Sequence, residues 1–171
     1  MKTYTVKERE HAFRPSIWVL SRNRQRIEGK ASFHETCFYP QQYLDGKEYD
    51  GQNKLIGLQF SLTKKHQNDA IISWACKEGI IGVGPYWHVD GSKGIWWREP
   101  SITVVPGQKF EFKIEASIKK NTVDIFLRTD QTEWIRTRKE MQVGCWSWVL
   151  PPHYGGQLAA SHPMKLNLEY K

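Results

Sequence analysis

Apolar and polar residues alternate at every second position along much of the chain. The clearest case is residues 109–118, in which one set of alternate positions is apolar and the other is charged or polar: Phe110, Phe112, Ile114, Ala116 and Ile118 against Lys109, Glu111, Lys113, Glu115 and Ser117. Alternation with period two places the two sets on opposite faces of a β-strand. We therefore predict a strand with one core face and one face of paired charges in water, followed by a turn at Lys120 and Asn121 into a second strand.

Further strands are predicted by the same alternation, and Gly, Pro, Asp and Asn residues separate them. They cover residues 16–20, 27–39, 54–62, 69–76, 80–89, 95–98, 143–149 and 164–170. In the strand at 54–62, the side chains expected on the core face are Ile56, Leu58, Phe60 and Leu62. Ten or more short strands without a sustained helical period indicate an all-β fold, a sandwich of two sheets rather than a small barrel. With 171 residues, 39% of them hydrophobic, we expect one domain spanning residues 1–171.

The net charge of +7 suits an anionic partner. The cationic clusters are short, and we interpret them as solvated loop charge at strand ends: residues 22–26, 64–66, 119–120 and 136–139. Aromatic residues do not alternate with Lys and Arg on one sheet face, which argues against nucleic acid as the partner.

Cysteines and histidines give no sign of a metal site or a disulfide framework. Cys37, Cys76 and Cys145 are far apart and form no C-x-x-C pair, so we expect buried reduced thiols. The six histidines are scattered, and we predict neither a metal ligand set nor a cofactor. No apolar stretch is long enough to span a membrane, and the first residues lack the apolar core of a signal peptide. These features indicate a protein made without its own signal peptide, cytoplasmic or virion-associated, with no membrane partner.

Four segments, in this order along the chain, carry a resemblance to a family. They are Asn53-Lys54-Leu55-Ile56-Gly57-Leu58, then His66 with Asp69-Ala70-Ile71-Ile72-Ser73-Trp74, then Tyr86-Trp87-His88-Val89-Asp90-Gly91, and finally residues 155–162. Between about residues 33 and 170 the chain resembles small single-domain concanavalin A-like β-sandwich proteins of bacteria and phages, most of them uncharacterised. Ser73 stands where that family has glycine, Ala75 where it has arginine and Ser161 where it has proline. The resemblance implies a jelly roll whose concave face often binds carbohydrate.

Tryptophan content gives independent support for a glycan ligand, because sugar rings stack on indoles and anionic sugars need a nearby cation. The chain has eight Trp residues, some of which must belong to the core. The ligand-binding residues that we predict are Gln59, Tyr86, His88, Trp96, Trp97 and Arg98.

Three functions remain open from the sequence. The first is a non-catalytic, lectin-like module that binds a glycan or acidic polysaccharide, with no catalytic residue. The second is a phage virion decoration, head-fibre or tail accessory protein held by other subunits, which could also touch host glycans. The third is a polysaccharide lyase in which Gln59, Tyr86, His88 and Arg98 neutralise a uronate and move its proton.

Glycoside hydrolysis is not expected. Glu111 and Glu115 lie about 13 Å apart on a strand, too far for the carboxylate pair of a retaining glycosidase. For His162, which follows a turn, we expect a structural hydrogen bond that ties this turn down.

Overall fold

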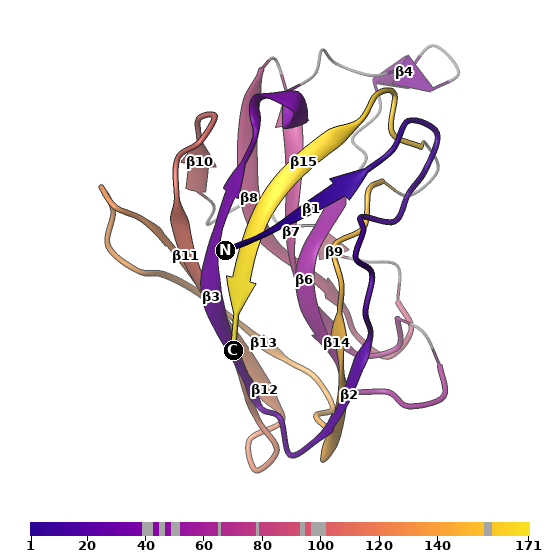
Figure 1. The fold of residues 1–171 in the computed structure, drawn as a ribbon. Coiled ribbons are helices and arrows are strands. Elements are labelled where there is room, and N and C mark those ends of the chain that lie inside the picture. Colours follow the sequence, from indigo (N-terminus) through magenta and orange to yellow (C-terminus); the bar gives the residue numbers. More distant parts are fainter. Residues whose placement is uncertain are drawn as a thin grey trace.

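The chain folds into two antiparallel β-sheets that lie face to face (Figure 1). The computed structural model describes residues 1–38, 52–64, 66–77, 79–92, 102–155 and 159–171, together with the backbone of residues 43–44, 47–48 and 95–96. Within these residues, no helix is long and apolar enough to cross a membrane.

The first sheet has six strands in the order β1-β15-β3-β11-β12-β13. Their bounds are β1 Lys2–Val6, β3 Arg26–Phe33, β11 Phe110–Ser117, β12 Thr122–Thr129, β13 Ile135–Glu140 and β15 Met164–Tyr170. The second sheet has seven strands in the order β10-β8-β7-β6-β14-β2, and β9 also pairs with β8. Their bounds are β2 Val19–Arg22, β6 Asn53–Gln59, β7 Asp69–Lys77, β8 Ile80–His88, β9 Ile95–Trp96, β10 Ile102–Val104 and β14 Trp146–Leu150. The short strands β4 (Tyr43–Leu44) and β5 (Lys47–Glu48) pair with each other, and η1 (Glu35–Cys37) is a 3₁₀ turn.

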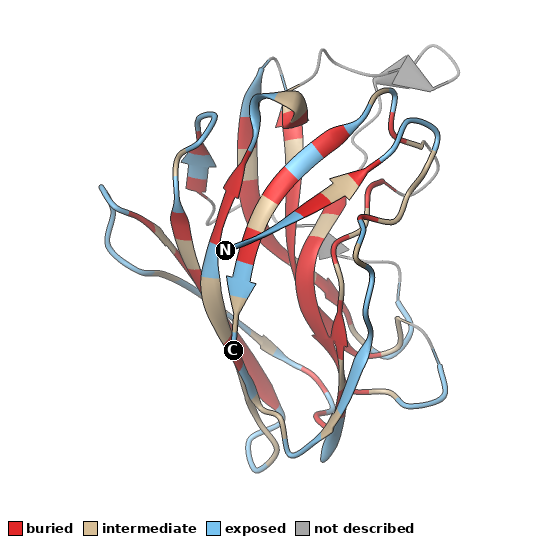
Figure 2. Cartoon of the chain, viewed as in Figure 1, coloured by how far each residue is buried: buried red, intermediate tan, exposed pale blue. Residues whose placement is uncertain are grey.

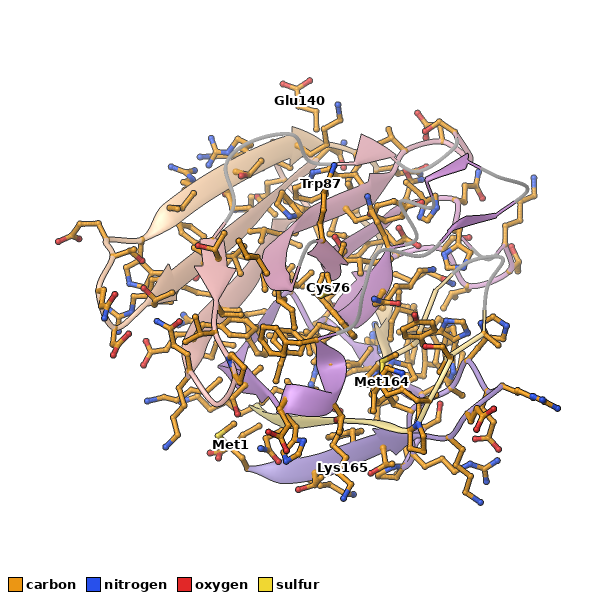
Figure 3. All side chains as sticks on the ribbon, turned by 90° about the horizontal axis from the view of Figure 1, so that it is seen from above. Met1, Cys76, Trp87, Glu140, Met164 and Lys165 are labelled. Atoms are coloured by element: carbon orange, nitrogen blue, oxygen red, sulfur yellow. The ribbon has the colours of Figure 1, made fainter. Side chains whose placement is uncertain are left out.

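The hydrophobic core fills the space between the two sheets. Buried positions alternate with less buried ones along strands such as β11 and β15, whereas β6 and β7 are buried along almost their whole length (Figure 2). On β11, Phe110, Phe112 and Ile114 are buried, whereas the alternate positions carry the predicted charges. Trp87 and Cys76 enter the same core from β8 and β7, as the view from above shows (Figure 3). The predicted all-β jelly-roll sandwich of two antiparallel sheets is therefore confirmed.

Several predicted boundaries were wrong. Leu62 is 51% exposed because β6 ends at Gln59 and the chain turns away. The long strand predicted at residues 27–39 ends at Phe33, where the 3₁₀ turn begins. Residues 136–139 are not a loop but belong to β13, an edge strand in which Arg136 and Arg138 both donate to Asp124. Charged side chains are a common way to protect such an edge.

Two structural expectations concern single side chains. Cys37 and Cys76 are buried free thiols as predicted, but Cys145 is exposed, in the segment that leads into β14. His162 ties its turn to η1, with Nε2 2.8 Å from the carbonyl oxygen of Thr36, which confirms the structural role expected for it.

Candidate functional site

A row of five directly paired residues crosses the seven-stranded sheet from its β2 edge to β8. These residues, which we call the cross-sheet row, are Leu20, Trp148, Gln59, Asp69 and His88. Directly paired residues of antiparallel strands point to the same face. Ala70, which follows Asp69, and Trp87, which precedes His88, are paired with each other and point to the opposite face, into the core. The cross-sheet row therefore lies on the face that points away from the six-stranded sheet.

Asp69 is the centre of this row and is completely buried. Its Oδ2 lies 2.7 Å from Nδ1 of His66, and its Oδ1 lies 2.5 Å from Nδ1 of His88. Oδ1 also accepts a hydrogen bond from the backbone N–H of His88 at 3.2 Å. Burial raises the pKa of the Asp69 carboxyl, but the hydrogen bonds and charges of the two histidines outweigh burial and leave the pKa below its usual value. The carboxyl is therefore ionised at neutral pH.

An ionised carboxylate can only accept hydrogen bonds, which fixes the tautomers of both histidines. His66 and His88 each donate from Nδ1 to Asp69, so each neutral ring keeps a lone pair on Nε2. For His66 the structure agrees with this assignment, because the Lys54 ammonium lies 3.3 Å from its Nε2 as a donor. Nε2 of His88 can therefore accept a proton, and Asp69 holds the ring in its orientation.

Lys54 and Tyr86 complete the cluster, which we call the proton network: Lys54, His66, Asp69, Tyr86 and His88. Burial lowers the pKa of the half-buried Lys54, and the charge of Asp69 partly opposes this effect. Burial and the charge of Asp69 both raise the pKa of Tyr86, so its hydroxyl keeps its proton at neutral pH. The Tyr86 ring meets the His88 ring edge-on, with centroids 4.9 Å apart.

A cavity of about 380 Å³ opens beside the proton network. Its walls are formed by Lys64, His66, Gln67, His88, Asp90, Gly91 and Ser92. Asp90 and Gly91 both have positive φ, which is the geometry of the tight turn after β8 that forms one wall. The cavity gives a ligand access to two imidazoles whose orientation is already fixed.

The residues predicted from the sequence are distributed unevenly over this site. Gln59 and His88 flank Asp69 in the cross-sheet row, and Tyr86 belongs to the proton network. Gln59 is itself buried and donates to the carbonyl oxygen of Ser61 at 2.9 Å, so it supports the turn that carries His66. The backbone of Trp96 pairs with Tyr86, but its side chain lies outside the described residues. Trp97 and Arg98 lie wholly outside them.

Lys54, His66 and Asp69 were not predicted as site residues. They are brought together by sheet register and by the 61–68 turn, and neither is visible in sequence spacing. His66, Asp69 and His88 also offer ligand atoms within 4.8 Å of one another, a group that could hold a metal ion and that the scattered histidines did not suggest. Here Nδ1 of both histidines donates to Asp69, and the Lys54 ammonium supplies the positive charge that balances Asp69. The proton network is thus electrically balanced by its own side chains.

Replacement of Lys54 by methionine tests the burial of its ammonium. The pKa of Lys54 is lowered in the folded state, so between this lowered pKa and about 10.4 the unfolded chain binds more protons than the folded one. The free energy of unfolding of the wild type therefore increases as pH rises through that window. The groups around it are His66, Asp69 and His153. We expect urea unfolding to show wild type gaining stability relative to Lys54→Met between pH 8 and pH 10. A constant difference between the two proteins would show that the ammonium is solvated.

No protein-family model matches the chain, and no curated protein sequence matches it. Solved structures do. An alginate lyase from Klebsiella pneumoniae superposes on this chain with a TM-score of 0.60 at 9% identity. The match covers 85% of this chain and 59% of the lyase, so the present chain spans less than two thirds of that protein's length. A functionally unknown protein from Saccharomyces cerevisiae gives 0.54 at 9% identity, with 99% and 86% covered.

A further match is the PL-14 alginate lyase from Aplysia kurodai, with a TM-score of 0.52 at 9% identity, covering 99% of this chain and 81% of that one. At such identities the likeness concerns the fold alone. The fold is the concanavalin A-like jelly-roll sandwich that the sequence predicted.

Proposed function

We propose that this protein is a polysaccharide lyase that cleaves an acidic, uronate-containing polysaccharide by β-elimination at the proton network. The observation that carries the proposal is the pairing of His88 and Tyr86 beside a fully buried carboxylate. Asp69 and Tyr86, whose pKa values are perturbed, contact His88, which lines the cavity, and perturbed groups beside a cavity are typical of catalytic sites.

The proton network supplies both proton transfers that β-elimination needs. The C5 proton of the uronate passes to Nε2 of His88, the C5–H electron pair forms the C4=C5 double bond, and the C4–O bond breaks. The departing glycosidic oxygen takes a proton from the hydroxyl of Tyr86, whose raised pKa keeps it protonated until that moment. Asp69 holds His88 in the reactive tautomer and stabilises the imidazolium that forms.

The uronate carboxylate must be neutralised before its α-proton becomes acidic enough to remove. Lys64 lines the cavity and is the cation that can pair with this carboxylate. The Lys54 ammonium, 3.3 Å from Nε2 of His66, already balances the charge of Asp69, and Asp90 is an acidic residue of the same cavity wall. We therefore assign the neutralisation of the uronate to Lys64.

Two of the similar structures with TM-scores above 0.5 are alginate lyases. The fold that they share with this chain is thus one that carries polysaccharide lyases, and this supports the proposal without assigning any residue. The residue roles rest on the geometry of the proton network alone.

The second candidate is a glycan-binding module without catalysis. Trp146 and Trp18, on the same sheet face, are 38% and 44% exposed, as stacking surfaces for sugars are. This candidate predicts saturable binding of the polysaccharide with no unsaturated product.

A Tyr86→Phe variant tests the lyase. Purified protein is incubated with polymers of mannuronate, guluronate and glucuronate, and the ultraviolet absorbance of the new C4=C5 bond is followed. We expect wild type to release product on at least one polymer and Tyr86→Phe to lose at least about 100-fold in rate, because the proton donor is gone.

Tyr170→Phe, a matched change on the six-stranded sheet, is the control and should keep the wild-type rate. A Tyr86→Phe variant as fast as this control would refute the role of the hydroxyl, and wild type that binds without forming product would favour the second candidate.

A further inference from the structure

Beside the proton network, the β2 edge of the same sheet exposes a group of large side chains that the lyase chemistry does not use. We call this group the aromatic strip: Trp18, Leu20, Arg22, Trp146 and Trp148. Trp18, Leu20 and Trp146 are 44%, 43% and 38% exposed, although residues of this kind are usually buried. Contiguous exposed apolar side chains with a polar rim typically mark a binding surface.

The aromatic strip is ordered by strand pairing and by ring contacts. Trp146 is paired with Arg22 across β14 and β2, and the Arg22 guanidinium carbon lies 6.0 Å from the Trp146 ring centroid. The Trp18 and Trp148 rings meet edge-on with centroids 6.3 Å apart. The strip therefore presents fixed indole faces with a cation beside them.

The aromatic strip lies on the same sheet face as the proton network. Trp148 is paired with Gln59, which is paired with Asp69 and then with His88, so three strand spacings separate Trp148 from His88. At 4.7–4.9 Å for each spacing this distance is about 14 Å. Gln59 and Asp69, which lie between the two ends, are buried and hydrogen-bonded to the turn that carries His66. An extended ligand that contacts both ends therefore passes over this turn.

We propose that the aromatic strip is a second binding subsite for the acidic polysaccharide, which extends the reactive site and selects long chains over short ones. The inference rests on the proposed function for the identity of the ligand. Sugar rings of the chain stack on Trp146 and Trp148, and Arg22 pairs with a uronate carboxylate. The polysaccharide then runs across the strands from β2 toward β8.

The positive charge of the aromatic strip favours the acidic polysaccharide over a second copy of the chain as its ligand. Arg26 is already paired with Glu28 and Glu115, whereas no carboxylate in the described part of the chain forms an ion pair with Arg22. Two β2 edges placed side by side would bring Arg22 and Arg24 of both copies together without compensating acidic groups. A polyanion supplies the missing charge.

The test compares Trp146→Ala with Trp134→Ala, which removes an indole 37% exposed beside the six-stranded sheet. Calorimetric titration with a polyuronate of twenty or more sugars and with a trimer gives the two affinities. We expect Trp146→Ala to weaken polymer binding by about tenfold, a loss of the order measured for one stacked ring, and to weaken trimer binding less. Trp134→Ala should bind both ligands as wild type does.

Arg22→Gln separates charge from stacking. We expect this variant to weaken binding of the polyuronate and to reduce the dependence of its affinity on salt. Binding of a neutral polysaccharide of equal length should be unchanged. Equal affinities for Trp146→Ala and Trp134→Ala would overturn the subsite, and so would sedimentation showing a wild-type dimer that Trp146→Ala dissociates. Loss of polymer binding in Trp146→Ala when wild type forms no product would support the subsite and refute only the lyase.

Discussion

Replacement of Asp69 by asparagine is expected to abolish lyase activity while the sandwich stays folded. The ionised carboxylate accepts hydrogen bonds from Nδ1 of both His66 and His88. An amide has one acceptor atom and one donor group, so it cannot accept from both rings. One histidine must then change tautomer, and if this is His88 its Nε2 carries a proton and no longer acts as a base. By analogy with the loss of an orienting aspartate in hydrolase triads, we expect a rate about 10³- to 10⁴-fold lower.

Asp124→Asn is the matched control for this variant. Asp124 is also nearly buried and accepts from Arg136 and Arg138, but it belongs to the six-stranded sheet. We expect Asp124→Asn to lower stability and to leave the rate of a folded sample unchanged. If the Asp69→Asn protein is folded and keeps the wild-type rate, the proton network is not the catalytic site.

Acid unfolding provides a second measurement on the Asp69→Asn variant. The folded-state pKa of Asp69 is lowered, so its contribution to stability is complete above about pH 3.9, the pKa of an unfolded aspartate, and is lost as pH falls toward the folded-state pKa. The difference in unfolding free energy between wild type and Asp69→Asn should therefore shrink below about pH 3.9. A difference independent of pH would mean that the pKa of the Asp69 carboxyl is the same in the folded and the unfolded chain.

Replacement of Gly29 by alanine is expected to destabilise the sandwich strongly. Gly29 lies in β3 between β15 and β11, opposite Tyr170 and Phe112. An added Cβ would lie 2.0 Å from the backbone carbonyl oxygen of Glu169 and 2.8 Å from Cζ of Phe112. The Phe112 ring can turn, but the backbone of β15 must move. We expect a loss of about 3 kcal/mol in the free energy of unfolding.

Gly79→Ala separates this overlap from the general effect of adding a methyl group. Gly79 has a φ of 75° and nothing within 4 Å of an added Cβ, so only the strain of the left-handed conformation applies, about 1 kcal/mol. Urea unfolding of both variants gives the comparison. A Gly29→Ala protein as stable as Gly79→Ala would show that β3 and β15 are less closely spaced than the structure indicates.

The strands with one fully apolar face were predictable from sequence, because alternation in segments such as residues 109–118 directly records the burial of β11. The strand β13 was not, since its outward Arg136 and Arg138 and its half-buried Thr137 give no apolar face to recognise. The strands β1 and β10 were also missed, because five and three residues contain too few periods to stand out.

The site was also predictable only in part, but the reason differs from the one that applies to the strands. Tyr86 and His88 could be placed on one face because they are two residues apart on one strand. Asp69 joins them only through the register of β7 with β8, and Lys54 and His66 join through a side chain and a turn. Short-range periodicity cannot encode such long-range contacts, so Tyr86 and His88 were visible in the sequence as site residues while Asp69, which orients His88, was not.

The most direct test of the central claim is to incubate the wild-type protein with polyuronates and follow the absorbance of the unsaturated product. The proton network predicts that absorbance rises with saturable kinetics on at least one polymer, and that Asp69→Asn and Tyr86→Phe both suppress it. If wild type binds the polymers and absorbance does not change on any of them, the claim of lyase chemistry is contradicted.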